Sequence, residues 1–145
     1  MDGADLEDAD LKPELTKIEG NDDEIKERFA VALKFGTAGL RGVLGAGTNR
    51  MNIYDCTSGN IRDLANWVKT QGGTQTVAIS YDSRIKSDVF AKVAAGVFAA
   101  NGVQVNILAC PDAGFRPCLL RPVILHTSAG VMVTASHNPS KYNGY

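Results

Sequence analysis

Residues 130–139 read GVMVTASHNP, and SKYNGY follows them at residues 140–145. The apolar, partly β-branched run that opens this stretch predicts a buried strand, and Asn138-Pro139 ends it abruptly. Ser136 is therefore expected on a tight loop at the carboxyl end of a strand. Ligands bind at that edge of open α/β sheets, so the stretch predicts both an α/β fold and a site at Ser136.

Strands and helices are predicted to alternate upstream of this loop. Strands are expected at residues 76–80 and 103–107, with one helix after Asn52 and another that Ser87-Asp88 can cap and Gly102 ends. Such alternation implies right-handed crossovers. The expected fold is an α/β, three-layer α/β/α sandwich with a largely parallel (mixed) sheet.

Composition narrows the class of protein. The chain has 145 residues, of which 44% are hydrophobic and 21% are charged, as in one compact domain. The formal net charge of −1, without a Lys/Arg cluster, argues against nucleic acid and anionic membranes as partners. No signal sequence or apolar run of about 18 residues is recognised. The three cysteines lack CxxC spacing, which favours reduced thiols and a cytoplasmic location.

The N-terminal region is expected to have two parts. Residues 1–20 are acidic with a weak helical pattern, and they predict a loosely docked extension to a domain spanning residues 21–145. Asn21 is a candidate N-cap for a helix that runs to about Leu33, with Ile25 and Phe29 on its buried face.

A glycine-bearing string, FGTAGLRGV, occupies residues 35–43 and contains Arg41 as its one charged residue. Its glycines would let the backbone approach an anion closely. The alternative interpretation is a glycine-bearing strand or hairpin whose arginine is exposed to solvent. The spacing fits neither a Walker loop nor the dinucleotide-binding fingerprint.

Two segments carry a resemblance to a known family. TASHNP at residues 134–139, with Tyr142-Asn143-Gly144 after it, resembles the phosphoserine loop of the α-D-phosphohexomutases, the phosphoglucomutase and phosphomannomutase superfamily. GTAGLRG at residues 36–42 is similar to the first segment of the same enzymes. A strand followed by Asp82-Ser83-Arg84 also resembles the family, and we assign that turn a supporting role.

The resemblance implies phosphoryl exchange between a phosphoserine and a sugar phosphate. Such a transfer needs positioned oxygens and positive charge, whereas a His directly after a Ser is not by itself a hydrolase triad. The implied catalytic residues are Ser136, His137 and Arg41. The implied loop and substrate supports are Thr134, Asn138, Asn143 and Gly144. The phosphoryl group on Ser136 is the implied ligand of Mg²⁺, whose main ligands are expected in a later domain.

The resemblance further implies a hexose bisphosphate activator and interconversion of hexose 1-phosphate and hexose 6-phosphate, with glucose favoured over mannose. The expected partners are sugar phosphates and the remaining mutase domains. The chain ends at Tyr145, where the family continues to a lysine, so it is expected to be an inactive first domain on its own. One segment departs from the family's pattern. Pro117 and Pro122 fall where the family usually has a helix that leads into the serine strand, and a proline inside a helix removes a hydrogen bond. A phosphopentomutase and a non-catalytic phosphosugar-binding module are the alternatives.

Overall fold

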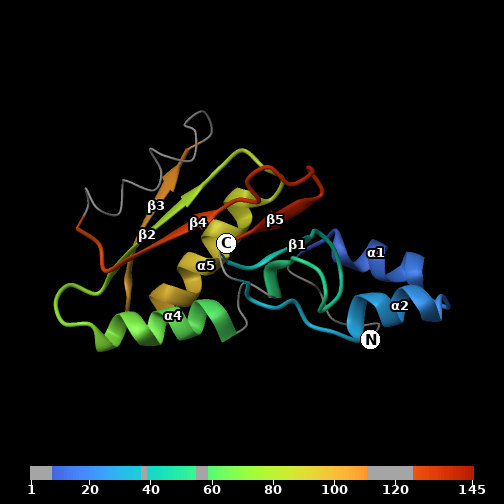
Figure 1. The fold of residues 1–145 in the computed structure, drawn as a ribbon, viewed down its shortest axis with the longest axis horizontal. Coiled ribbons are helices and arrows are strands. Elements are labelled where there is room, and N and C mark those ends of the chain that lie inside the picture. The colour runs from blue at the N-terminus through green and yellow to red at the C-terminus, as the bar shows by residue number, and fades with distance from the viewer. Residues whose placement is uncertain (1–7, 37–38, 55–58, 111–125) are drawn as a thin grey trace.

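The computed structural model describes residues 8–36, 39–54, 59–110 and 126–145. Within these ranges the chain forms a three-stranded parallel sheet, a separate antiparallel pair of strands and flanking helices (Figure 1). The predicted α/β class with largely parallel strands is thus confirmed. The expected departure from a helix at Pro117 and Pro122 lies outside the described residues.

The parallel sheet has β2 (Thr76–Tyr81) at its centre, between β3 (Gln104–Ala109) and β4 (Ala129–Val133). Ile79 lies opposite Ile107 of β3 and Val131 of β4. Four consecutive residues of β2, 77–80, are buried, as expected of a strand covered on both faces. β3 is an edge strand, and Ile107 on it remains 43% exposed.

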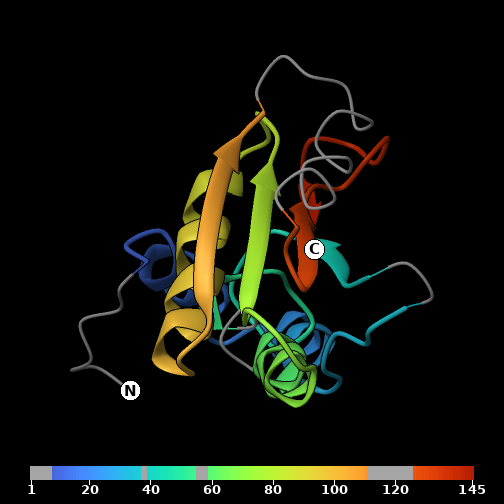
Figure 2. The ribbon, with the colours of Figure 1, turned by 90° about the vertical axis from the view of Figure 1, so that its left-hand side faces the viewer.

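Helix α5 (Ser87–Ala100) packs along one face of this sheet, and α4 (Gly59–Thr70) lies beside α5 (Figure 2). Phe90 and Phe98 of α5 are fully buried. The helix ends before Gly102, whose φ of +77° suits glycine, as predicted. The predicted cap at Ser87-Asp88 is wrong: Lys86 takes the N-cap position, because the Ser87 hydroxyl is hydrogen-bonded to Asp82 at 2.8 Å instead.

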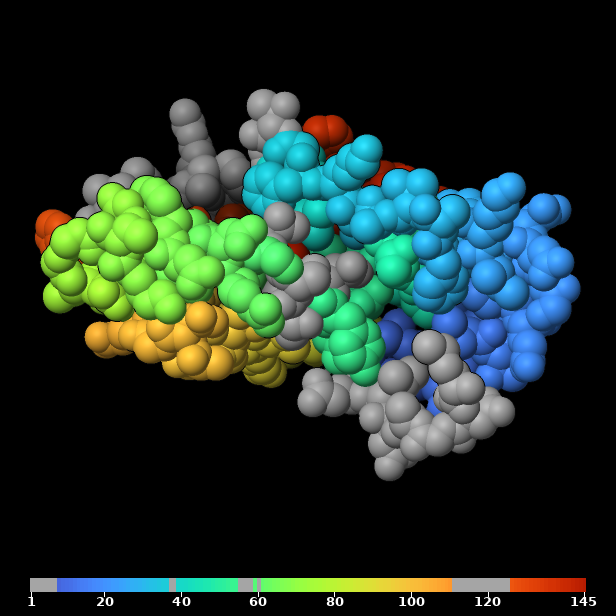
Figure 3. Space-filling view, turned by 90° about the horizontal axis from the view of Figure 1, so that it is seen from below, coloured from blue at the N-terminus to red at the C-terminus, as the bar shows by residue number. Residues whose placement is uncertain are grey.

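Helices α1 (Leu11–Ile18) and α2 (Asp22–Phe29) occupy the opposite end of the molecule from α4 (Figure 3). The predicted cap is confirmed, since the Asn21 side chain accepts a hydrogen bond from the Glu24 N–H. The predicted end at Leu33 is wrong. Asn49 N–H donates to Arg28 O at 2.9 Å, and Thr48 Oγ1 donates to Val31 O at 3.2 Å, so these carbonyls bond outside the helix.

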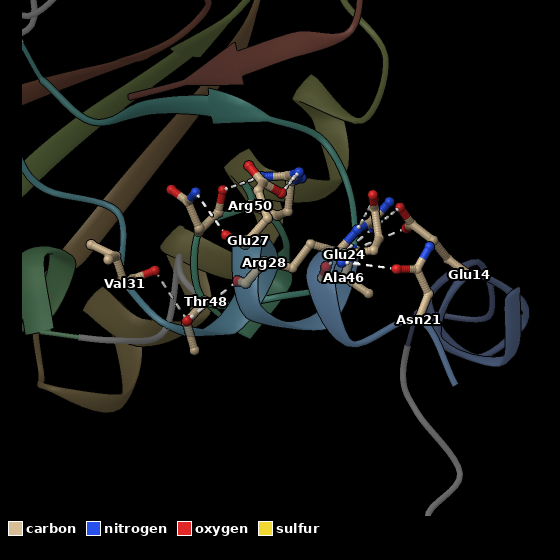
Figure 4. Close-up of polar contacts among 10 residues, drawn as sticks. Glu14, Asn21, Glu24, Glu27, Arg28, Val31, Ala46, Thr48 and Arg50 are labelled. Carbon is tan, nitrogen blue, oxygen red and sulfur yellow. Dashed lines mark hydrogen bonds and ion pairs between the residues drawn. The ribbon is translucent and has the colours of Figure 1, made fainter. Parts of the chain in front are cut away.

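The expected buried face of α2 is also wrong, because Ile25 is 36% and Phe29 is 42% exposed. Charged contacts hold this helix instead (Figure 4). Arg28 pairs with Glu14 of α1 and with Glu24, whose Oε1 lies 2.8 Å from Arg28 Nε. The hydrogen bond with Glu14 raises the pKa of Arg28 above its ordinary value.

Helix α1 is docked more specifically than its weak sequence pattern predicts. Leu11 and Ile18 are buried, and the Glu14 carboxylate accepts the Ala46 N–H at 2.9 Å. Further upstream, Asp8 pairs with Lys86 at 2.7 Å. A domain boundary at residue 20 stays a prediction.

The antiparallel pair joins distant parts of the chain. β1 (Arg41–Val43) pairs with β5 (Tyr142–Gly144), and Leu40 and Tyr145 exchange two backbone hydrogen bonds just beyond it. Thr134 N–H donates to Gly144 O at 2.9 Å, so the pair adjoins the end of β4. The pairing places Arg41 beside the segment that follows Ser136.

The sequence also led to expectations about membrane insertion and about the redox state of the cysteines. None of the helices in the described ranges has the length and apolar character that a membrane span requires. Cys110 is disulfide-bonded. The expectation of reduced thiols is therefore wrong for Cys110, because spacing along a sequence does not determine which cysteines meet in space.

Candidate active site

Ser136 lies three residues beyond the end of β4, on an exposed turn at the carboxyl edge of the parallel sheet. Its φ of +54° is in the left-handed region, which costs a residue other than glycine roughly 1–2 kcal/mol. Asn138 N–H closes the turn by donating to Ala135 O at 3.0 Å. The surrounding contacts must therefore hold Ser136 in this conformation.

A hydroxyl relay stabilises the left-handed backbone. Thr134 Oγ1 donates to Asp82 Oδ2 at 2.6 Å and accepts the Ser136 N–H at 3.0 Å. Because the carboxylate can only accept, it orients the threonine proton toward itself and leaves a lone pair for Ser136. Thr134 thus contacts the loop through its side chain.

His137 is exposed, and its Nδ1 lies 3.3 Å from Ser136 Oγ. The ring can donate to the serine oxygen or accept from it, according to which nitrogen carries the proton. No carboxylate in the described ranges orients this ring, so the pair lacks the third member of a hydrolase triad.

Asn143 is fully buried and all its polar atoms are hydrogen-bonded. Its Nδ2 donates to Ile85 O at 2.9 Å and to Ser87 Oγ at 3.0 Å, and its Oδ1 accepts the Gly144 N–H at 2.8 Å. Ser87 Oγ in turn donates to Asp82. Asn143 therefore fastens β5 to the start of α5, in the same network that holds Thr134.

Gly144 allows β1 to approach the loop. A Cβ at this position would lie 2.8 Å from Arg41 Cγ and would collide with Leu40 O. Arg41 is directly opposite Gly144 in the ladder and is exposed, and its side chain has no hydrogen bond or ion pair among the described residues. The fold thus brings the Arg41 guanidinium, which has no partner in the described ranges, next to β5, whose Gly144 carbonyl accepts the Thr134 N–H.

Asn138 contributes backbone groups to the loop: its N–H closes the turn and its carbonyl accepts a hydrogen bond from Arg84 at 2.7 Å. Arg84 and Asp82 were given only a supporting role from the sequence, yet Arg84 donates to four carbonyls of residues 136–142 and Asp82 accepts the Thr134 hydroxyl. The signal was the Asp-x-Arg turn after β2. An open hollow of about 460 Å³, lined by Asp82, Ser83, Arg84, Ile85 and Ser140, lies beside them.

The described residues do not form a metal site by themselves. No group of three or more His, Cys, Asp or Glu side chains within these ranges is placed to hold an ion. Mg²⁺ prefers about six oxygen ligands, and a phosphoryl group on Ser136 would supply only part of that set.

The fold and this site define an α/β domain that presents a serine, next to a histidine, on a hydrogen-bonded turn at the carboxyl edge of a parallel sheet. The family model described as phosphoglucomutase/phosphomannomutase, alpha/beta/alpha domain I, matches residues 32–145. The chain therefore belongs to the phosphoglucomutase/phosphomannomutase family, as a domain I, and the predicted α/β/α architecture is the one that this family has.

Individual relatives agree with this assignment. The phosphoglucomutases of Staphylococcus aureus strains USA300, NCTC 8325 / PS 47 and COL are each 38% identical to the chain over 126 residues. The matched region is 86% of this chain and 22% of each relative. The chain thus spans about a fifth of the length of these curated relatives.

Proposed function

We propose that the protein to which this domain belongs is a cytoplasmic, magnesium-dependent phosphohexomutase. It interconverts hexose 1-phosphate and hexose 6-phosphate through a phosphoserine at Ser136 and a bisphosphorylated sugar. The observation that carries the proposal is the exposed Ser136 hydroxyl, 3.3 Å from His137 Nδ1, on the left-handed turn of a phosphohexomutase domain I.

The proposed reaction is two phosphoryl transfers. In the first, the bond between phosphorus and Ser136 Oγ breaks as a sugar hydroxyl oxygen bonds to phosphorus, and the hydroxyl proton ends on Ser136 Oγ. The sugar bisphosphate then turns round, and the bond between its other phosphorus and the sugar oxygen breaks as Ser136 Oγ bonds to that phosphorus. The serine proton ends on the sugar oxygen. In this proposal His137, whose Nδ1 lies 3.3 Å from Ser136 Oγ, carries the proton at that oxygen, and Arg41 supplies positive charge for the phosphoryl oxygens.

The other ligands of Mg²⁺ are proposed to lie outside this chain. The ion would neutralise charge on the phosphoryl oxygens when it is bound. The same reasoning predicts that residues 1–145 on their own fold but do not catalyse, because the proposal assigns the remaining charge and the walls that exclude water to other domains of the enzyme.

Glucose phosphates are the proposed preferred substrates, since the matched relatives are named phosphoglucomutases. The direct test is Ser136→Ala in the full-length protein, assayed with glucose, mannose and ribose phosphates. Activity should disappear, and intact mass should show a phosphoryl adduct in the wild type alone. Turnover of ribose phosphates only would indicate a phosphopentomutase, and no wild-type turnover would favour a non-catalytic module.

A further inference from the structure

The Arg84 side chain binds the serine loop, residues 136–142, through four of its backbone carbonyls. Its Nη2 lies 2.7 Å from both Ser136 O and Asn138 O, while its Nη1 lies 3.2 Å from Pro139 O and 3.3 Å from Tyr142 O. Only 18% of the Arg84 side chain is exposed. The planar guanidinium therefore fixes four carbonyls of one loop relative to one another.

Asp82 connects this clamp to Ser136 by a second route. Its Oδ1 accepts the Arg84 N–H at 3.0 Å, and its Oδ2 lies 3.7 Å from Arg84 Nε. The same Oδ2 receives the Thr134 hydroxyl that holds the Ser136 N–H. Asp82 and Arg84 thus hold the two ends of the Ser136 backbone unit, its N–H and its carbonyl.

The orientation of that carbonyl determines where the next amide points. The peptide bond between Ser136 and His137 is trans, and in a planar trans peptide the C=O and the N–H point in opposite directions. Since Ser136 O faces Arg84, the N–H of His137 points away from the guanidinium. It donates to no residue in the described ranges, so it is available to a phosphoryl oxygen beside Ser136.

We infer that Arg84 and Asp82 are positioning residues of phosphoryl transfer. They hold Ser136 in its left-handed conformation and turn the His137 N–H outward as a donor to the transferred group. The inference rests on the proposed function and adds to it the residues that shape the loop, together with one backbone donor.

The kinetic test compares Arg84→Ala, Arg84→Lys and Asp82→Asn in the full-length enzyme. We expect kcat for both Arg84 variants to fall about a hundredfold, with a much smaller change in KM, because misplacement of the reacting group affects the chemical step. Arg84→Lys should not restore the rate, since an ammonium keeps the charge but cannot bridge four carbonyls. Asp82→Asn, which keeps one acceptor oxygen, should lose less.

A second readout does not depend on turnover. Hydrogen exchange of the peptide covering residues 134–142, followed by mass spectrometry on the full-length protein, should be faster in Arg84→Lys than in the wild type. Arg62→Lys, at an exposed position of α4, is the matched control and should change neither rate nor exchange. A thermal melt of each variant shows that the assayed protein is folded.

The outcomes separate the two hypotheses. Wild-type kcat in Arg84→Lys would overturn the inference, because charge alone would then suffice, and so would unchanged exchange in the loop. A full-length wild type without mutase activity would refute the proposed function instead, and the exchange data would still decide whether Arg84 shapes the loop.

Discussion

Two arginines organise two regions of this domain in different ways. Arg84 binds carbonyls of a single loop, residues 136–142, whereas Arg28 binds Glu14 of α1, Glu24 of its own helix and, at 3.4 Å, Ala46 O. The partners of Arg84 belong to one short segment, so that contact sets a backbone shape. The partners of Arg28 lie on separate elements, so that contact sets how the elements pack (Figure 4). Perturbing the first region should change activity, and perturbing the second should change stability alone.

The largest effect on stability is expected from Gly144→Ala. The added Cβ would collide with Leu40 O and lie 3.2 Å from Arg41 Cα, so backbone rather than a flexible side chain must move. We expect the free energy of unfolding to fall by more than about 3 kcal/mol, measured by urea denaturation. Gly96→Ala on α5 is the control, because nothing lies within 4 Å of its Cβ position. The free energy of unfolding of Gly96→Ala should rise by about 0.5–1 kcal/mol. An equal loss of stability in both variants would refute the steric argument.

Asn143→Ala should cost about 2–3 kcal/mol and lower activity as well. The change leaves the Gly144 N–H and the Ser87 hydroxyl without their Asn143 partner in a buried site, and it also removes the bond to the part-buried Ile85 carbonyl. Asn66→Ala, at an exposed position of α4, should be close to neutral. Chemical denaturation gives the stability and the mutase assay gives the rate. Full activity in Asn143→Ala would show that the hydrogen bonds of Asn143 do not influence the serine loop.

Arg28→Met should lower the free energy of unfolding by about 1–2 kcal/mol without a change in kcat. The variant loses the contacts with two carboxylates and the Ala46 carbonyl, none of which touches the serine loop. The deficit should shrink in 1 M salt, because screening weakens the ion pairs of the wild type. Arg62→Met is the matched control. A tenfold loss of kcat in folded Arg28→Met would show that the two regions are coupled.

Lys86 links the two regions, and the smallest effect is expected there. Burial opposes its charge, but the hydrogen bonds with Asp8 and Asp10 outweigh burial and raise the pKa of Lys86. A group with a raised folded-state pKa contributes its stability below the unfolded value, about 10.4, and loses it as pH rises through the folded value. At pH 7 the free energy of unfolding of the wild type should therefore exceed that of Lys86→Met by less than about 1 kcal/mol, and the difference should vanish as pH rises through the raised folded-state pKa of Lys86. A difference that grows with pH would contradict this assignment.

Local signals predicted the parts of the fold that depend on neighbours in sequence. The cap at Asn21, the stop at Gly102 and the buried β2 each follow from a few adjacent residues. The end of α2 could not be predicted, because Thr48 and Asn49, about twenty residues away, bond its last carbonyls. Ile107 is more exposed than its alternating pattern suggests, since sequence does not reveal that β3 is an edge strand.

The candidate site divides in the same way. Ser136 and its neighbours were evident from one loop motif, and the nearness of Ser136 to His137 follows from adjacency. The Arg84 clamp joins residues 52–58 positions apart through backbone carbonyls, which carry no side-chain signature. A motif can therefore name the residue that reacts more readily than the residues that hold it in place.

The pairing of β1 with β5 also imposes an order on biosynthesis. Arg41 and Leu40 leave the ribosome about a hundred residues before Gly144 and Tyr145, which complete their hydrogen bonds. At roughly 5–20 residues per second, β1 waits on the order of 5–20 s for its partner strand. The parallel sheet needs the chain only as far as Val133, so its three strands can pair before β5 has been made. Arg41 and the segment that follows the serine loop therefore come together only after the parallel sheet can form, when β5 is synthesised.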